Sequence, residues 1–124
     1  MIPKILICDD DEAIRQRLVH VLQTAFAREG RQVQFLQAVN GQQALDIIAR
    51  ELITLLVIDA QLPEIDGYQA TTLLKSDPAT AAIPVILLSR AEDVQRVTEA
   101  GANRIFDKPV PEDQLVLGVF DLLG

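Results

Sequence analysis

The chain has 124 residues, 49% of them hydrophobic, which is enough to fill the core of one ordinary domain without disulfide or metal staples. Eleven basic residues against 18 acidic ones give a formal charge of −7, which argues against direct binding of nucleic acid because phosphates repel negative charge. No apolar stretch approaches the roughly 20 residues of a membrane helix, and the single cysteine, Cys8, suits a reducing cytoplasm. We therefore expect residues 1–124 to form one cytoplasmic domain that does not contact a membrane.

Short apolar runs alternate with longer segments in which apolar residues recur at intervals of three or four. The short runs are typical of buried strands, and the longer segments predict helices. In chain order, the predicted elements are a strand at 5–8, a helix from about 12 to 28, a strand at 33–39, a helix at 41–48, a strand at 55–58, a helix from about 68 to 75, a strand at 84–88, a helix from about 92 to 100, a strand at 104–107 and a helix at 112–123. Gly30 and Gly101 stand where helices should stop.

This alternation predicts an α/β fold in which helices cover both faces of a five-stranded parallel sheet. We expect the doubly wound, flavodoxin-like strand order 2-1-3-4-5, with the very apolar strand 55–58 at the centre. Four of the five strands end in residues with polar or charged side chains, namely Asp9 with Asp10, Asp59, Ser89 and Lys108. Ligands of open parallel sheets bind outside the carboxyl ends of the strands. Three carboxylates, a hydroxyl and an amine are therefore expected to converge on one crevice.

The chemistry of this group favours phosphoryl transfer. Clustered carboxylates repel one another unless they share a cation or take up protons, and an all-oxygen site with room for water suits Mg²⁺. Asp59, at the end of the central strand, is the natural nucleophile for an acyl phosphate. Lys108 would neutralise charge beside it, and Ser89 could donate a hydrogen bond to a phosphate oxygen.

Each of these features also has an ordinary structural explanation. An acidic run after a strand is more often a solvated turn or a helix cap, Lys-Pro is a common loop dipeptide, and Ser89 could be a simple cap. The functional interpretation depends on the joint occurrence of all of them at one end of the sheet. His20, within the first predicted helix, is expected at the surface or at its boundary, and Cys8 is expected to be a small buried apolar residue rather than a nucleophile.

With these residues the chain resembles the response-regulator receiver family over essentially its whole length. The acidic pair Asp9 and Asp10 follows the first strand, Ser89 ends the fourth, and Lys108-Pro109 follows the fifth. The loop after the third strand reads Asp59-Ala60-Gln61-Leu62-Pro63-Glu64-Ile65-Asp66-Gly67, close to the family's Asp-x-x-Met-Pro-x-x-Asp-Gly.

The resemblance implies a role for each position. Asp10 would bind Mg²⁺ directly, Asp9 directly or through water, Asp59 through its carboxylate, and Gln61 through its backbone carbonyl. Asp59 would accept a phosphoryl group from a histidine kinase, a histidine phosphotransfer protein or a small acyl phosphate. The chain would then catalyse only its own phosphorylation and dephosphorylation, and it would not be an enzyme acting on other substrates.

The family's response to phosphorylation is also implied. Lys108 would pair with the phosphoryl group, and Ser89 would swing towards it. That movement would bias the face built from the fourth helix, the fifth strand and the fifth helix, which is the family's output surface.

Three positions depart from the family's pattern. Arg90 stands after the switch hydroxyl where a small residue is usual, and it could shield the site or steer an anionic donor. Ile105 stands where Tyr or Phe is common, which puts the family's aromatic rotamer switch in doubt, although Phe106 is adjacent. Gln61 could influence how water approaches the phosphoryl group and hence how long that group persists.

Three other classes of protein share some of these features. A phosphohydrolase of the haloacid dehalogenase type needs a second Asp two residues after its nucleophile, where this chain has Gln61. A flavodoxin-like electron carrier would hold a flavin phosphate after the first strand, where Asp9 and Asp10 would repel it. A degenerate receiver that acts only as an interaction module would keep the fold without the phosphorylation.

The apolar residues of the last predicted helix cover a wide arc of its circumference, about 160° when each residue turns by 100°. A helix lying on a sheet needs an apolar stripe of only about 100°, so part of this surface has no evident use within one domain. One explanation is a homodimer through Val116 and Phe120 at the edge of the arc. The others are an unusually deep seat for the helix, or cover from an effector domain that follows Gly124.

Overall fold

Five strands form a single parallel sheet in a computed structural model that describes residues 1–90 and 100–124. They are β1 (Lys4–Cys8), β2 (Gln34–Ala38), β3 (Leu55–Asp59), β4 (Val85–Ser89) and β5 (Arg104–Asp107). Their order in the sheet is β2-β1-β3-β4-β5, and each neighbouring pair is parallel. The predicted strand order and fold class are confirmed.

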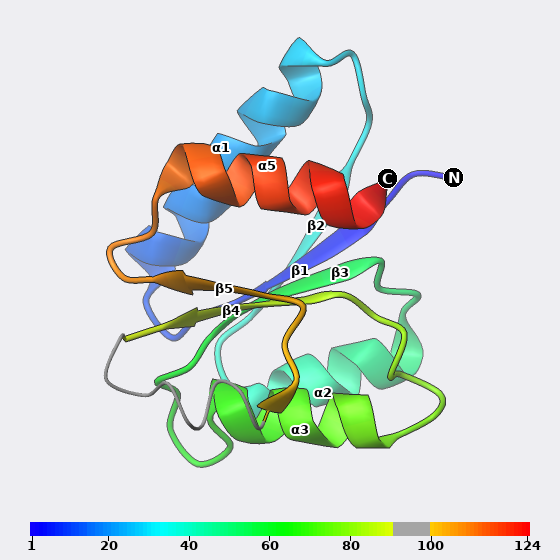
Figure 1. Ribbon diagram of the computed structural model, residues 1–124, viewed down its shortest axis with the longest axis vertical. Helices are drawn as coiled ribbons and strands as arrows, with labels where there is room; N and C mark the ends of the chain where they lie inside the picture. Colours follow the sequence, from blue (N-terminus) through cyan, green and yellow to red (C-terminus); the bar gives the residue numbers. More distant parts are fainter. Residues whose placement is uncertain (91–99) are drawn as a thin grey trace.

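Helices cover both faces of this sheet (Figure 1). The described helices are α1 (Glu12–Arg28), α2 (Gly41–Arg50), α3 (Gly67–Ser76) and α5 (Glu112–Leu123). Helices α1 and α5 lie on one face, and α2 and α3 lie on the other. The helix predicted from about residue 92 to 100 falls mostly on residues 91–99, which lie outside the described part of the chain. Within that described part, no helix has the length and apolar character that crossing a membrane requires.

The core has two layers because successive side chains of a strand point to opposite faces of the sheet. Leu56 and Leu87 pack towards α2 and α3, whereas Val57 and Leu88 pack towards α1 and α5. All residues of β3 and β4 are buried, which explains why these strands are continuous apolar runs. The strands therefore form a rigid base whose carboxyl ends carry the polar side chains.

Lys75 links the amino ends of β4 and β5, which lie at the edge of the sheet opposite the carboxyl ends of the strands. Lys75, in the last turn of α3, donates from Nζ to the carbonyl oxygens of Ala81 at 3.1 Å and Ile83 at 2.7 Å. It also donates to Asn103 Oδ1 at 2.8 Å, and that oxygen accepts the backbone N–H of Val85 at 3.0 Å. Burial lowers the pKa of the Lys75 amine. The network fixes where both strands begin.

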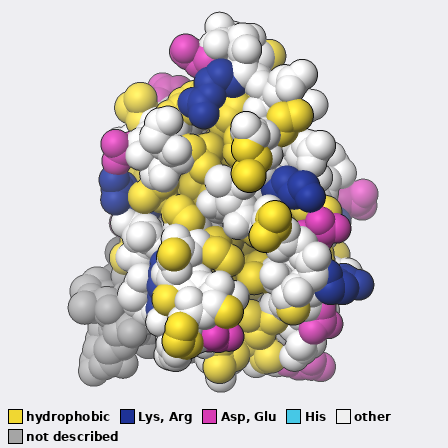
Figure 2. Space-filling view, turned by 90° about the vertical axis from the view of Figure 1, so that its right-hand side faces the viewer, with side chains coloured by type: hydrophobic (Ala, Val, Ile, Leu, Met, Phe, Trp, Pro, Cys, Tyr) yellow, Lys and Arg dark blue, Asp and Glu magenta, His cyan; other side chains and the backbone are white. Residues whose placement is uncertain are grey.

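The face of the molecule at these amino ends is rich in apolar side chains (Figure 2). Leu52, which precedes β3, is 81% exposed, and Met1 and Ile2 near the start of β1 are exposed as well. Both chain termini lie on this side (Figure 1). The polar strand ends and this apolar face are thus at opposite edges of the sheet.

Helix α5 is seated deeply on the sheet. Leu115 and Val119 are fully buried, and a Cβ added at Gly118 would lie 3.1 Å from Cζ of Phe106, so β5 approaches the helix closely. The ring of Phe120 lies 4.7 Å from that of Phe26 in α1, and the Arg31 guanidinium lies 5.2 Å from the centre of the Phe120 ring. The domain itself thus uses most of the wide apolar arc, and the exposed apolar residue of this helix is Leu117, at 69%.

Candidate functional site

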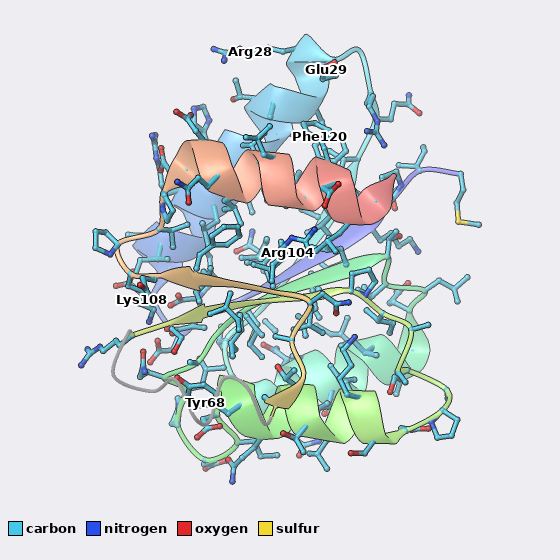
Figure 3. The ribbon with its side chains drawn as sticks, in the orientation of Figure 1. Arg28, Glu29, Tyr68, Arg104, Lys108 and Phe120 are labelled. Atoms are coloured by element: carbon cyan, nitrogen blue, oxygen red, sulfur yellow. The ribbon has the colours of Figure 1, made fainter. Side chains whose placement is uncertain are left out.

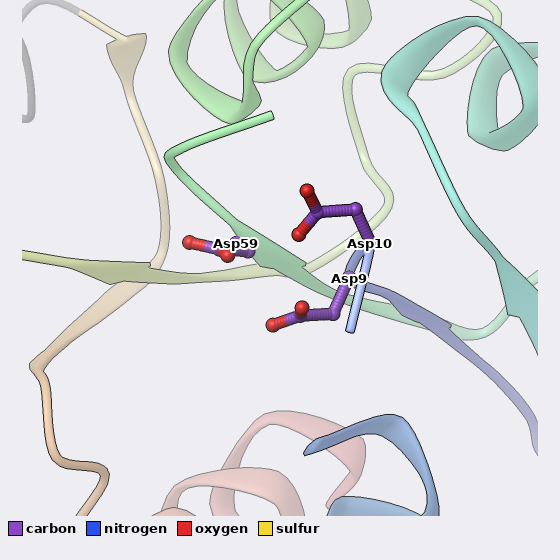
Figure 4. A group of neighbouring side chains, drawn as sticks. All are labelled: Asp9, Asp10 and Asp59. Carbon is purple, nitrogen blue, oxygen red and sulfur yellow. The ribbon is translucent and has the colours of Figure 1, made fainter. Parts of the chain in front are cut away.

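Three aspartates meet at the carboxyl ends of the neighbouring strands β1 and β3 (Figure 4). Asp9 and Asp10 follow β1, and Asp59 is the last residue of β3. One carboxylate oxygen from each lies within 4.8 Å of the other two. Asp9 and Asp59 are buried, whereas Asp10 is exposed, so the cluster is open to solvent on the side of Asp10. The sequence predicted these three residues as metal ligands, and the structure brings them together.

Asp11, the third acid of the run, has a different task. Its side-chain oxygen accepts the backbone N–H groups of Ala13 at 2.8 Å and Ile14 at 3.2 Å, and it thereby caps the amino end of α1. Acceptors at this position stabilise helices by satisfying N–H groups that have no partner within the helix. The ordinary explanation of the acidic run therefore holds for Asp11, and Asp9 and Asp10 remain for the site.

The carboxylate of Asp9 has an unsatisfied side. Its Oδ1 accepts the backbone N–H of Asp11 at 2.9 Å, but the buried Oδ2 has no hydrogen-bond partner among residues 1–90 and 100–124. Burial raises the pKa of this carboxyl from 3.8 to about 6, and the nearby Asp59 carboxylate adds to the rise. A buried acceptor beside two other carboxylates is costly unless a cation satisfies it. The donor set is oxygen only, which fits Mg²⁺.

Asp59 is held by a cation of the protein itself. Lys108, one residue beyond β5, forms an ion pair from Nζ to Oδ1 of Asp59 and donates to Gln61 Oε1 at 3.1 Å. The same Asp59 oxygen accepts the backbone N–H of Gln61 at 3.1 Å. Figure 3 labels Lys108 at the end of β5, on the edge of the molecule where the strands end. Strand-end residues of β3 and β5 thus meet across β4, as the sequence predicted.

Ser89, the last residue of β4, is fully buried at the same edge. Its hydroxyl is hydrogen-bonded to the hydroxyl of Tyr68, in the first turn of α3, and lies 3.3 Å from the carbonyl oxygen of Arg90. Sequence reasoning missed Tyr68 because it only marked the start of a predicted helix. It also missed Arg15, which donates to the backbone carbonyl of Asp9 at 2.8 Å and fixes the end of β1.

Gly67 brings α3 against the end of β3. A Cβ at this position would lie 2.3 Å from the carbonyl oxygen of Asp59 and 2.8 Å from Cα of Ala60. The Gly67 N–H donates to the Ala60 carbonyl at 3.0 Å. Only a residue without a side chain allows this approach, so the Asp-Gly pair of the loop has a direct structural reason.

The departures from the family's pattern lie at the border of the site. Arg90 is exposed immediately after β4, and Ile105 is 40% exposed on β5. Phe106 packs with the core residues beneath α1 and α5, and neighbouring strand residues point to opposite faces. Phe106 therefore cannot stand in for the aromatic residue that the family commonly carries at the position of Ile105.

Two minor predictions can also be compared with the structure. His20 is exposed on α1. Cys8 is buried and free, and burial together with the Asp9 carboxylate raises the pKa of its thiol to about 12. A thiol that stays protonated at neutral pH is a poor nucleophile, and both residues lie where the sequence predicted them.

Replacing Asp9 by Asn is expected to stabilise the metal-free protein by about 3 kcal/mol at pH 7, because it removes a buried charge. The folded-state pKa of Asp9, about 6, lies above its ordinary 3.8, so the wild type loses stability as the pH rises through that window. Asp9→Asn should lack this loss, and it should also lose the stabilisation by millimolar Mg²⁺ that we expect of the wild type. Urea unfolding between pH 4 and pH 8, with and without Mg²⁺, measures both effects. Equal responses of wild type and variant to pH would contradict the prediction.

Comparisons with known proteins agree with this geometry. A sequence model described as the response regulator receiver domain matches residues 5–119. The chain is 32% identical over 126 aligned positions to response regulator PleD of Caulobacter vibrioides, covering 98% of this chain and 26% of PleD. It is 34% identical over 123 positions to transcriptional regulatory protein SrrA of Staphylococcus aureus, covering 97% of this chain and 47% of SrrA.

A solved structure shows the same fold. The receiver domain of a signal transduction histidine kinase from Syntrophus aciditrophicus matches with a TM-score of 0.89 and 31% identity, covering 98% of this chain and 89% of that one. The chain therefore belongs to the response regulator receiver domain family. It spans about a quarter of PleD and about half of SrrA.

Proposed function

We propose that residues 1–124 form one receiver domain that works as a phosphorylation-dependent switch, with Asp59 as the phosphoacceptor. The observation that carries this proposal is the convergence of Asp9, Asp10 and Asp59 within 4.8 Å, with Lys108 paired to Asp59. Family membership supports the same class of function. A degenerate receiver would have no reason to keep a buried, unsatisfied carboxylate oxygen on Asp9, so that alternative is not favoured.

In the proposed reaction an Asp59 carboxylate oxygen attacks the phosphorus of a phosphohistidine on a kinase or phosphotransfer protein. A P–O bond forms as the P–N bond breaks, and the electron pair goes to the imidazole nitrogen, which takes up a proton. Acetyl phosphate can serve in the same way, with acetate as the leaving group. Phosphoryl transfer depends mainly on positioning and charge neutralisation, and Lys108 supplies a fixed positive charge beside the acceptor.

Mg²⁺, held by Asp9, Asp10, Asp59 and the backbone carbonyl of Gln61, would supply the remaining positive charge that the transferred phosphoryl oxygens need. The orphaned Asp9 Oδ2 supports this set of ligands. After transfer, Lys108 would pair with the phosphoryl group, and the hydroxyl of Ser89 would turn towards it. The surface of β5 and α5 would then carry the output, with Arg90 and Ile105 modulating the response.

The proposal is tested by incubating the protein with Mg²⁺ and acetyl phosphate and measuring its mass. We expect the mass to rise by one phosphoryl group, and we expect hydroxylamine to remove that group, as it does with acyl phosphates. A protein that stays unlabelled under these conditions, and also with a phosphorylated phosphotransfer protein, would refute the assignment.

The docking surface for the phosphodonor protein is proposed to be a groove beside the site. It has a volume of about 400 Å³ and is bounded by Asp9 and Lys108 of the site and by the apolar side chains of Ile14, Leu18 and Val110. Ile14, on α1, is 42% exposed. An apolar groove that includes Lys108, the ion-pair partner of Asp59, suits a partner that must bring its own phosphorylated residue to Asp59.

Ile14→Ala is expected to slow transfer from a phosphorylated histidine phosphotransfer protein by about tenfold, the usual loss when an apolar anchor is truncated. Labelling by acetyl phosphate should be unchanged, because that donor needs no docking surface. Leu73→Ala is the matched control, since Leu73 is 53% exposed but lies on α3, on the other face of the sheet. Equal slowing by both variants, or slower labelling of Ile14→Ala by acetyl phosphate, would argue against this docking surface.

Three further proposals concern the surroundings of the domain. Longer relatives support an effector domain beyond this chain. The free, buried Cys8 suits a reducing cytoplasm, where we place the protein.

The homodimer through Val116 and Phe120 stays a prediction. Both residues pack on the core of their own domain, so Leu117 would have to contribute most of the exposed apolar area.

A further inference from the structure

The hydroxyl of Ser89 is engaged by a tyrosine rather than by the acceptor. Among the described residues, the partners of Ser89 Oγ are the hydroxyl of Tyr68 and, at 3.3 Å, the carbonyl oxygen of Arg90. The carbonyl of Arg90 accepts from Ser89, and either hydroxyl can donate in the Tyr68–Ser89 bond. Ser89 is 0% exposed and Tyr68 is 4% exposed, so this chain of two hydrogen bonds is sheltered from water.

The backbones at both ends of the Tyr68–Ser89 bond are fixed. The carbonyl of Ser89 accepts the N–H of Lys108 at 3.0 Å, and the preceding carbonyl of Leu88 accepts the N–H of Ala60 at 2.8 Å. On the other side, a capping box between Asp66 and Gln69 begins α3, and Gly67 is packed on the carbonyl of Asp59. Figure 3 labels Tyr68 at this start of α3. Any change at the bond must therefore come from side-chain rotation.

We infer that Tyr68 is a positioning residue that holds Ser89 in its unphosphorylated rotamer, so that phosphorylation of Asp59 must break the Tyr68–Ser89 hydrogen bond. This inference rests on the proposed function. When a serine changes from one staggered rotamer to another, its Oγ moves by roughly 2.4 Å. A shift of that size is larger than the variation in length that a hydrogen bond allows. A hydroxyl that turns towards a phosphoryl group on Asp59 therefore leaves Tyr68. The tyrosine opposes the switch, and it sets how strongly the phosphoryl group must attract Ser89.

The first test compares the affinity of wild type and Tyr68→Phe for beryllofluoride, a mimic of the phosphoryl group, in the presence of Mg²⁺. The variant keeps the ring and removes only the hydroxyl. Because a net hydrogen bond corresponds to about three- to tenfold in an equilibrium, we expect Tyr68→Phe to bind beryllofluoride about three- to tenfold more tightly.

A matched control lies one turn further along α3. Thr71 is fully buried, and its hydroxyl donates to the carbonyl of Gly67 at 2.7 Å without contacting Ser89. Thr71→Val removes a buried hydrogen bond of the same helix, so it reproduces any general loosening of α3. Its affinity for beryllofluoride is expected to equal that of the wild type.

Ser89→Ala supplies the second arm, in a double-mutant cycle. With Ser89 absent there is nothing for Tyr68 to hold, so adding Tyr68→Phe should leave the affinity unchanged. The chain also provides an internal probe, because Tyr68 is its one tyrosine and it has no tryptophan. Beryllofluoride should change the tyrosine emission of the wild type, and in Ser89→Ala this change should be lost or much reduced.

Unchanged or weaker binding by Tyr68→Phe would overturn the inference, and so would an equal gain in the Ser89→Ala background. If Tyr68→Phe did not fold, the emission of wild type against Ser89→Ala would decide, and equal responses would overturn it. A wild type that binds no beryllofluoride would remove the proposed function and this inference together. A wild type that binds, with no effect of Tyr68→Phe, would remove the inference alone.

Discussion

Asp59→Asn is expected to reduce the hydroxylamine-labile phosphorylation by more than about 100-fold, because it removes the nucleophile itself. The amide keeps the size of the side chain and the hydrogen bond from the Gln61 N–H, so the fold should be preserved. The measurement is the mass of the protein after incubation with Mg²⁺ and acetyl phosphate, followed over time for wild type and variant.

The control for this variant is Asp66→Asn. Asp66 lies in the same loop but caps α3, and Asn is an equally good cap. This variant should be labelled at the rate of the wild type. Labelling of Asp59→Asn at a comparable rate would move the acceptor to another residue, with Asp10, the exposed member of the cluster, as the first to examine.

Gly67→Ala is expected to lower the free energy of unfolding by about 3 kcal/mol, at the upper end of the usual cost of overpacking. The added Cβ would lie 2.3 Å from the carbonyl oxygen of Asp59, and a backbone atom cannot move aside as a flexible side chain can. The gain in helix propensity from Gly to Ala, about 1 kcal/mol, offsets only part of this. Urea unfolding measures the change, and labelling of Asp59 should fall because α3 is pushed away from the acceptor.

Gly30→Ala separates this steric effect from an ordinary glycine effect. Gly30 has a φ of +65° but nothing within 4 Å of an added Cβ, so its replacement should cost only the strain of a left-handed backbone, about 1 to 2 kcal/mol. Phosphorylation of Gly30→Ala should be normal. If Gly67→Ala were as stable as Gly30→Ala and were labelled normally, the close approach of α3 to β3 would not matter for the site.

The sequence was sufficient to predict the sheet because its strands are buried on both faces. Runs such as 55–58 contain no polar residue, so their pattern matches neither an amphipathic helix nor a half-exposed strand. The alternation of these strands with helices predicts a parallel sheet. The observed ends of the described elements differ from the predicted ones by no more than two residues. Once the strands are parallel, their last residues must share one edge, and Asp9, Asp59 and Lys108 were predicted to meet for that reason alone.

The contacts that pattern reasoning missed join segments whose side chains could have pointed elsewhere. Nothing in the order of residues says that the hydroxyl of Tyr68 reaches Ser89, 21 positions further on. The sequence also did not show that the acids of the run 9–11 have different roles. Asp11 caps α1 and Asp9 is buried because of where the chain turns into α1. The width of the apolar arc on α5 did not reveal how deeply the helix is seated, because that depends on Gly118 and Phe106 together.

The lysine at the far edge of the sheet has a consequence for how a signal can travel. Because Lys75 Nζ holds the segment before β4 and the Asn103 side chain just before β5, neither strand can slide along its own axis. The carboxyl ends are held as well, since the Ser89 carbonyl accepts the N–H of Lys108 at 3.0 Å. A change beside Asp59 must then be carried by side-chain rotation, and the opposite edge of the sheet stays at rest.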